Sequence, residues 1–436
     1  MSHKRLARIS LLLAAIGLNA APAVMGLAPV HAAEEKKAPE QPANTVRPDM
    51  YKLIDPAQTK PLIDAKNYAE FQSRIDQAAA LPNVTPYEAF ILNRMRLQLA
   101  QAQDNNEASV KALEAIISSD QLKPEERARF IEATANIYYS GLKNFDKAIE
   151  WFDRYGKETG DTAKFRPFAL RAYFLKNDFA TAKAEAIKDI DAAKAANTAP
   201  AKDTILVLAN VGVKNKEPDT YLRAVEELTR YYPTEDYWND LLSRTRGKKT
   251  YNNRLDLDLV RLKAVTVPGR METDDYVEQA ELATLGGFFT EAKIALEKAY
   301  PNGVVPAGQY KAQIEKMRTS ANKGAADDAK NIDAGIPAAQ KSKDGVGLVN
   351  LGYNYVTLGQ YDKGIDLMKQ GIAKGVSKNP EDAKLRLGYA QAIAGKKDES
   401  IATLTPLAAG ADPRADLARY WINYQTAPKI AAGEKQ

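Results

Sequence analysis

The chain has 436 residues and a formal net charge of +5, and it contains no cysteine and two histidines, His3 and His31. Because both histidines lie in the first 32 residues, the rest of the chain cannot form a Cys–His pair, a Ser-His-Asp triad, a haem ligand set or an ordinary zinc site. The composition therefore predicts a protein with no cofactor, no metal site and no disulfide, which packing alone stabilises.

Residues 1–32 are organised like a secretory signal peptide. Three basic residues precede an apolar run that begins at Ile9, and small residues lead up to a cleavage site before Ala33. We expect cleavage there and export into a bacterial periplasm. An uncleaved membrane anchor is the alternative, but Asn19 and Pro22 interrupt the run. No later stretch reaches the ~18 continuous apolar residues that span a bilayer, so no transmembrane segment is expected in the mature chain.

Residues 33–49 are charged and proline-rich and show no apolar period, which predicts a flexible tether. Removal of residues 1–32 takes away three positive charges and leaves a net charge of about +2. The remaining positive charges are interspersed with acidic residues along the chain. Nucleic-acid binding requires a clustered basic surface, so we expect none.

Residues 50–323 are predicted to form an array of paired helices. Phe71 and Ile75 repeat at helical spacing before Pro82, and the pair Thr85 and Pro86 has the cap and first-turn proline of a new helix. Further along, aromatic, small and large residues recur on successive second helices, and their small residues, Ala148 and Ala182, stand 34 residues apart. A period of this size indicates stacked supersecondary units.

The segment 234–272 fits this period poorly and is predicted to be irregular. Its sequence LDLDL, from Leu255, alternates like a short strand but also fits a helix, which the helices expected on both sides favour. Paired carboxylates such as Asp274 and Asp275 are better explained as helix caps than as acid–base groups. Whether the segment is a degenerate repeat or an insertion stays open.

Residues 324–344 are rich in Ala, Asp, Lys and Gly, and are predicted to be a linker or surface insertion made of a weakly amphipathic helix with loops, with a hinge as the alternative. Residues 345–425 then hold one pattern twice, since Gly352 recurs as Gly388 and Gly359 as Gly395. Gly359 is expected to end a helix in the left-handed conformation. Gly352, Gly364 and Gly371 are expected where two helices cross closely. Residues 426–436 form a tail.

The first of these copies resembles the tetratricopeptide repeat. The residues that match the family's pattern are Leu351, Gly352, Tyr355, Gly359 and Tyr361. The copy departs from it with Gly364 in place of the usual alanine, Met368 in place of phenylalanine and Leu348 in place of tryptophan. The second copy departs further, with Gln391 at the aromatic position and Ser400 at the small one.

The resemblance implies an all-α fold, a superhelical stack of antiparallel helix hairpins with an open, curved inner wall made by the first helix of each hairpin. Such a groove would accept a peptide or helix of a partner protein. The candidate groove residues that it implies are Ile137, Arg171, Phe174, Glu281, Tyr353, Val356, Tyr389 and Ile393. Tyr353 and Tyr389 are preferred because they occupy one position in adjacent copies, although packing tyrosines are an equal alternative.

Three functions follow from these expectations. The first is a periplasmic scaffold or adaptor that binds a protein or peptide of the cell envelope and is not an enzyme. The second is a glycan- or peptidoglycan-associated helical protein. The third is a structural oligomer built through repeat-repeat contacts, and the sequence leaves the oligomeric state open. Two Ser-x-x-Lys sequences, at Ser140 and Ser320, lack the further elements that penicillin-recognising enzymes require.

Overall fold

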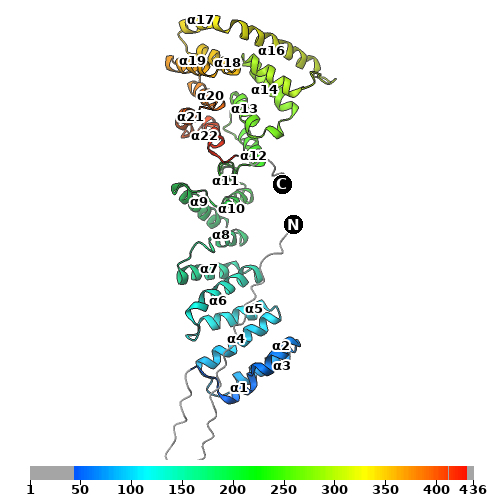
Figure 1. The fold of residues 1–436 in the computed structure, drawn as a ribbon, viewed down its shortest axis with the longest axis vertical. Helices are drawn as coiled ribbons and strands as arrows, with labels where there is room; N and C mark the ends of the chain where they lie inside the picture. Colours follow the sequence, from blue (N-terminus) through cyan, green and yellow to red (C-terminus); the bar gives the residue numbers. More distant parts are fainter. Residues whose placement is uncertain (1–43, 411, 430–436) are drawn as a thin grey trace, which may run out of the picture. The chain divides into compact units, whose positions relative to one another are not determined.

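The computed structural model describes residues 44–410 and 412–429. The expected signal peptide, the first part of the expected tether (33–43) and the end of the tail (430–436) lie outside the described residues. Every regular element in the described ranges is a helix (Figure 1), as expected for an all-α stack of hairpins. The chain divides into two compact units, which meet in sequence between Asp178 and Phe179.

The first unit stacks antiparallel helices in chain order, with α4 paired to α5 and α6 paired to α7. A π-helical turn, Ile137–Gly141, continues α6. The helices are α1 (Pro48–Ile54), α2 (Pro56–Asp64), α3 (Tyr68–Ala79), α4 (Pro86–Ala102), α5 (Asn106–Ile117), α6 (Pro124–Asn136), α7 (Phe145–Thr159) and α8 (Arg166–Leu175).

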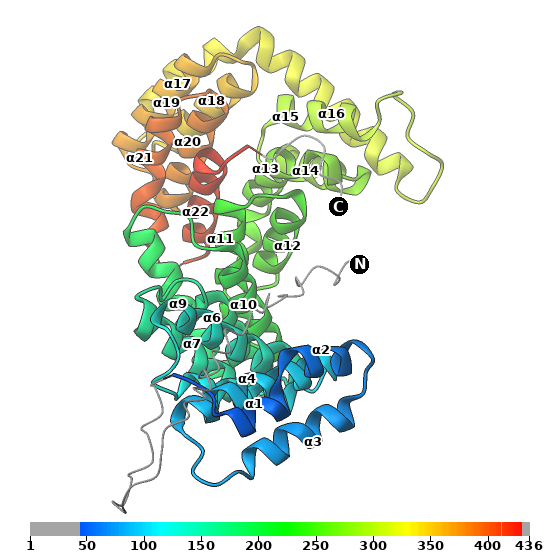
Figure 2. The same cartoon turned by 60° about the horizontal axis from the view of Figure 1, so that its bottom comes forward.

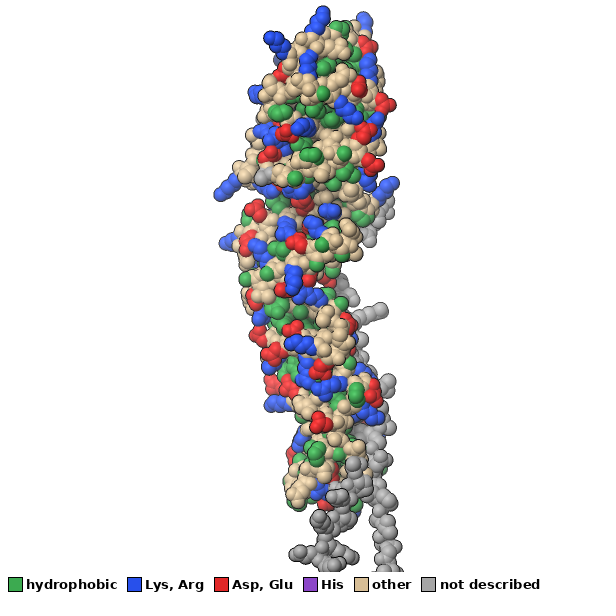
Figure 3. Space-filling view, turned by 90° about the vertical axis from the view of Figure 1, so that its left-hand side faces the viewer, with side chains coloured by type: hydrophobic (Ala, Val, Ile, Leu, Met, Phe, Trp, Pro, Cys, Tyr) green, Lys and Arg blue, Asp and Glu red, His purple; other side chains and the backbone are tan. Residues whose placement is uncertain are grey.

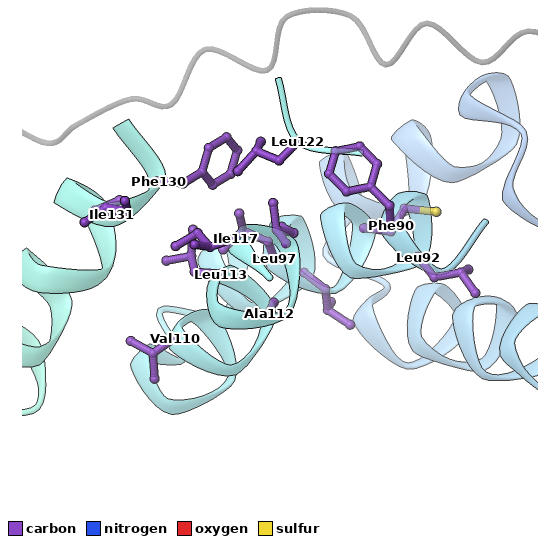
Figure 4. Close-up of a cluster of buried hydrophobic side chains, with 14 of the residues drawn as sticks. Phe90, Leu92, Leu97, Val110, Ala112, Leu113, Ile117, Leu122, Phe130 and Ile131 are labelled. Carbon is purple, nitrogen blue, oxygen red and sulfur yellow. The ribbon is translucent and has the colours of Figure 1, made fainter. Parts of the chain in front are cut away.

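A continuous apolar core runs between these hairpins. Figure 4 shows part of it, where Phe90 and Leu97 of α4, Leu113 of α5 and Phe130 and Ile131 of α6 lie in one cluster. Leu113 and Ile131 have no exposed surface. No hairpin buries its apolar face alone, and stacking removes that surface from water, which is the main stabilising term in such arrays.

The end of the expected tether is part of this fold, which corrects the prediction of a flexible segment up to residue 49. Val46 and Met50 are completely buried in the core of the first unit. Between them, Arg47 donates from Nε to Oε1 of Glu88 at 2.9 Å and from Nη2 to Oε2 at 2.6 Å, and from Nη1 to the carbonyl of Pro82 at 2.6 Å. The prediction failed because a single buried valine gives no periodic signal.

The Arg47–Glu88 pair should make the first unit sensitive to acid. Burial favours the neutral form of Glu88, but hydrogen bonds from Arg47 and Thr85 outweigh it and lower its pKa to about 2. Since an unfolded glutamate titrates near 4.3, the carboxylate contributes stability above that pH, up to about 3 kcal/mol, and loses it as the pH falls towards 2. The stability difference between the wild type and Glu88→Gln should therefore shrink between pH 5 and pH 2.

Urea unfolding checks this, in chains where Trp238 and Trp421 are replaced by phenylalanine so that Trp151 reports the first unit. A difference between wild type and Glu88→Gln that stays constant over this pH range would contradict the assignment.

The second unit contains hairpins α10/α11, α14/α15, α18/α19 and α20/α21. Its helices are α9 (Phe179–Ala195), α10 (Lys202–Lys214), α11 (Pro218–Tyr231), α12 (Glu235–Arg246), α13 (Asp256–Thr266), α14 (Thr273–Leu285), α15 (Phe289–Ala299), α16 (Lys311–Asn331), α17 (Gly335–Lys341), α18 (Val346–Thr357), α19 (Tyr361–Lys374), α20 (Pro380–Ile393), α21 (Lys397–Ala408) and α22 (Pro413–Thr426). Short 3₁₀ turns lie at Asn253–Leu255, Pro268–Arg270 and Ile332–Ala334.

Two expectations for single segments are confirmed in this unit. The LDLDL sequence is helical: Leu255 ends a 3₁₀ turn and the next four residues open α13, which packs against α12, so the segment 234–272 contains a helix pair. Gly359 and Gly395 have φ angles of 78° and 75°, the left-handed conformation expected where the first helix of each copy ends.

The segment 324–344 is mostly helix, as expected, but it does not begin as a separate linker, because α16 runs through residue 324 without a break. Ala321 and Ala325 are buried, and a Cβ built on Gly324 would lie 2.3 Å from the ring of Phe289 in α15. The small residues that suggested a linker therefore form the face on which α16 packs closely against α15.

Helices α18 and α19 cross at glycines, as expected. A Cβ built on Gly352 would lie 2.5 Å from the carbonyl oxygen of Gly364, and one built on Gly364 would lie 2.5 Å from that of Gly352. The two backbones thus approach more closely than any side chain would permit.

Gly352→Ala should lower the free energy of unfolding by about 1–3 kcal/mol, because the new methyl group overlaps a backbone atom that cannot rotate away. Gly347→Ala is the matched control on the same helix, since its Cβ would meet nothing closer than 3.6 Å. It should be neutral or add up to about 1 kcal/mol through helix propensity. Urea unfolding of both variants checks the pair, and equal effects would contradict the crossing.

Ion pairs join successive hairpins in both units. Arg94 pairs with Glu126 in the first unit, and Arg223 with Asp191 in the second, each across 32 residues. These separations are close to the repeat length. Acidic and basic side chains consequently intermingle on the surface, as on the face in Figure 3. Each exposed pair contributes at most about 1 kcal/mol.

The last helix of the second unit returns to earlier hairpins of the same unit, and Figures 1 and 2 both show α22 beside α11 and α13. The hydroxyls of Thr245 and Tyr420 share a buried hydrogen bond of 3.0 Å. Arg419 Nε donates to Oε1 of Glu226 at 2.7 Å. The expected stack of hairpins is present, and within this unit hairpins that are distant in sequence also meet, which the expected open inner wall did not include.

Candidate functional site

The inner side of the second unit is occupied by a buried group of charged side chains centred on Arg261. Arg261 belongs to α13 and is 1% exposed. Its Nε and Nη2 donate to the two carboxylate oxygens of Glu291 on α15, at 2.9 and 2.7 Å, and its Nη1 donates to Oδ1 of Asp258 at 2.9 Å. This bidentate geometry compensates the loss of water around the three charges.

Aromatic rings surround this guanidinium. Its carbon lies 4.4 Å from the ring centre of Tyr353 on α18 and 5.5 Å from that of Tyr389 on α20. Tyr353 also donates its hydroxyl hydrogen to Glu291 Oε2 at 3.1 Å and packs edge-on against Phe288. Side chains of α13, α15, α18 and α20 thus fill the space that an open array would leave to a partner.

The electrostatics of this group favour fixed charges. Burial opposes the charged form of Arg261, but Glu291 and Asp258 raise its pKa well above its ordinary value. Burial likewise opposes ionisation of Glu291, but Arg261 outweighs it and lowers the pKa of that carboxyl. Neither group is poised to exchange a proton near neutral pH, so the cluster joins helices rather than performing acid–base chemistry.

These positions correct part of the predicted groove. Tyr353 and Val356 are 1% and 2% exposed, so both belong to the core and a partner cannot reach them. Tyr389 is half-buried, with its ring centre 6.0 Å from that of Tyr353. Tyr353 lies against Arg261 of α13, Glu291 of α15 and Tyr389 of α20, so side chains of these helices cover the face of α18 that was expected to be open.

The other predicted residues are distributed over both units. Arg171 is exposed and Phe174 half-buried on α8 of the first unit, and Glu281 is exposed on α14 of the second. Ile137 and Ile393 are half-buried against the cores of their units. The structure therefore brings together Tyr353, Val356 and Tyr389, and these three lie in packing.

An open groove of about 330 Å³ lies in the first unit, on helices α3, α4 and α5. It is lined by Gln72 of α3, by Asn93, Arg96, Leu99, Ala100 and Gln103 of or next to α4, and by Ala108, Lys111 and Ala112 of α5. The resemblance predicts a groove between the first helices of successive hairpins. This groove instead lies across three consecutive helices.

The sequence places these residues on one face. Asn93, Arg96, Ala100 and Gln103 are three, four and three residues apart along α4, which is the spacing of one helical side. The floor is apolar and buried, since Leu99, Ala100 and Ala112 are 2–4% exposed. Sequence reasoning missed this face because the apolar residues of α4, such as Leu92 and Met95, dominated its pattern.

Polar groups rim this apolar floor. Nη1 of Arg96 donates to Oδ1 of Asn93 at 2.9 Å, which orients the half-buried guanidinium. Lys111 is exposed on the opposite helix. An apolar floor with a few oriented polar groups is the usual composition of a binding site. Within the described residues, no cluster of acidic side chains is arranged to hold a metal ion.

Across the residues that the structure describes, none of the helices combines the length and apolar character of a bilayer span. This finding concerns 44–410 and 412–429 alone.

Comparisons with known proteins find only distant similarities. No family model matches the chain, and no curated protein matches it. Among solved structures, a tetratricopeptide repeat protein from Parabacteroides merdae is similar at 12% identity over 62% of this chain and 98% of its own, with a TM-score of 0.27. The TPR domain of P58(IPK) is similar at 15% identity over 80% of this chain and 99% of its own, with a TM-score of 0.22.

A third similar structure, Naa15/Naa10 bound to HypK-THB, has 13% identity over 85% of this chain and 65% of its own, with a TM-score of 0.30. Scores this low carry no argument about function. What the chain's own helices establish is an all-α protein of stacked antiparallel hairpins.

Proposed function

We propose that this protein is a periplasmic scaffold that binds a segment of a partner protein of the cell envelope and catalyses no reaction. The observation that carries the proposal is the open groove on α3, α4 and α5, which has an apolar floor and oriented polar groups. In the second unit, the described side chains around Arg261 pack against one another. The signal-peptide pattern of residues 1–32 supports the location.

The stacked hairpins suit this role because they supply rigid helices that hold a groove open without a ligand. A preformed groove avoids the ordering cost that a flexible surface would add to binding. Among the described residues that line the groove, there is no acid–base pair and no nucleophile with a neighbouring base. Recognition of a partner is therefore the activity that its chemistry supports.

A substitution that fills the groove tests the proposal. Ala108→Trp places an indole over the floor, and the tagged variant should lose a partner that the wild type captures from an envelope extract. Ala57→Trp is the matched control, because both alanines lie in the first turn of a helix and donate their amide to an Asx cap. Equal capture by both variants would contradict the groove assignment.

The location and the alternatives are tested separately. Fractionation with mass determination of the mature chain should find it in the periplasm with Ala33 at its amino terminus. Release of muropeptides by the purified chain would instead favour a glycan-directed protein. Concentration-dependent mass in light scattering would favour a structural oligomer.

A further inference from the structure

The charges of the groove on α3, α4 and α5 identify the class of its occupant. Elsewhere in the first unit, cations that line helix contacts are paired with acids: Arg94 with Glu126 at 3.5 Å and Arg127 with Glu158 at 2.6 Å. In the groove, Arg96 forms one hydrogen bond to a described side chain, the neutral amide of Asn93. Lys111 forms no hydrogen bond or ion pair with any residue that the structure describes.

None of the described residues that line the groove is acidic. Glu107, one turn before Lys111 on α5, lies outside the lining, and Asp76 on α3 accepts a hydrogen bond from Gln72. The groove therefore presents two positive charges without internal compensation. An interface charge of this kind selects a partner of opposite sign and repels one of the same sign.

The surroundings strengthen this selection. The buried floor of Leu99, Ala100 and Ala112 excludes water from beneath the two cations, and a Coulomb interaction is stronger beside such a low-dielectric surface than in bulk water. The guanidinium of Arg96 is held by Asn93, so its remaining donors need little reorganisation to bind a carboxylate. The small alanines leave room for backbone close to the floor.

The remaining polar groups suit a main chain. Gln103 and Asn93 carry carboxamides that can donate to peptide carbonyls and accept from peptide amides. The groove therefore pairs main-chain hydrogen-bonding groups with two cations for side-chain carboxylates. Aromatic side chains, on which sugars and nucleobases stack, are absent from the described lining.

We propose that the groove on α3, α4 and α5 binds an extended, acidic segment of a partner protein, in which carboxylates pair with Arg96 and Lys111. This inference rests on the proposed scaffold function and names the class of its partner.

Fluorescence anisotropy with the full chain tests it. The probe is a fluorescein-labelled ten-residue peptide of alternating Glu and Ser, compared with peptides in which Gln or Lys replaces each Glu. The Glu peptide should bind at least about tenfold more tightly than the Gln peptide, the ratio that one charge-assisted hydrogen bond supplies. Its affinity should fall as salt rises, and the Lys peptide should not bind.

Variants locate the binding in the groove. Lys111→Glu should weaken the Glu peptide by about tenfold or more, and Arg96→Glu should do the same. Lys157→Glu is the matched control, because Lys157 is also an exposed lysine of the first unit, on α7, and changes the net charge equally. Circular dichroism should show unchanged helix content in all three chains.

Three results would overturn the inference: equal binding of the Gln or Lys peptide, equal loss in Lys157→Glu, or no binding of any peptide. If the envelope partner is nevertheless captured in a manner sensitive to Ala108→Trp, the scaffold function stands and the acidic class alone is rejected. If that capture fails too, both are rejected. Self-association abolished by Lys111→Glu would assign the groove to a second copy and would also overturn the inference.

Discussion

Replacing Arg261 by methionine is expected to lower the free energy of unfolding of the second unit by about 3–5 kcal/mol. The methionine fills similar space, but it leaves Glu291 and Asp258, 8% and 6% exposed, without their counter-charge. The loss of stability comes from these buried, unpaired carboxylates rather than from lost packing. Urea unfolding in a Trp151→Phe background measures it, since Trp238 and Trp421 then report the second unit.

Arg246→Met is the matched control for this experiment. Arg246 also pairs with two carboxylates, Asp256 at 3.1 Å and Glu278, but its side chain is 39% exposed. Water solvates both partners after the substitution, so the expected cost is at most about 1 kcal/mol. In addition, the double variant Arg261→Met/Glu291→Gln should cost less than the sum of its single changes. Equal costs for the two arginines would refute a special role for burial.

The second large effect is expected at the contact between α22 and helices α11–α13. Trp421 is 1% exposed and belongs to a buried apolar cluster of the second unit that includes Trp238 and Leu241. Trp421→Ala should cost about 3–5 kcal/mol, because it removes a large buried side chain and leaves a cavity between helices that are distant in sequence.

Tyr424→Ala provides the comparison on the same helix. Tyr424 is 41% exposed and touches Trp421 edge-on, so its loss should cost about 1 kcal/mol or less. Tryptophan fluorescence in the Trp151→Phe background follows the unfolding of both variants. A small effect of Trp421→Ala would show that α22 is dispensable for the second unit.

The parts of this fold that the sequence predicted are those that depend on the spacing of residues within one hairpin. Gly352 and Gly364 predicted a close helix crossing, and Gly359 predicted a left-handed turn, because each acts through neighbours within one hairpin. The helical state of LDLDL followed in the same way from its flanking helices. A repeat period reflects contacts between adjacent units, so it predicts features within and between neighbouring hairpins well.

The features that sequence missed depend on residues far apart in the chain. Lys248 meets Asp416 across 168 residues, and Arg419 meets Glu226 across 193. No periodic signal encodes such pairs. Tyr353 and Val356 were assigned to an open wall for the same reason, because nothing local in the sequence indicates that Arg261 of α13 packs on Tyr353. The groove was missed because the apolar residues of α4 dominated its pattern and because Arg96 and Lys111 come together only when α4 and α5 lie side by side.

The return of α22 also constrains how the chain acquires its structure during synthesis. The buried core of the first unit consists of residues up to Ala169, so this core can form early. The second unit cannot complete its core early, because Trp238 and Leu241 pack against Trp421, which is synthesised almost two hundred residues later. Long-range contacts of this kind form slowly and leave apolar surface open in the meantime. The nascent chain therefore exposes apolar surface of the second unit until α22 has been synthesised. Chaperone binding would matter most during that interval.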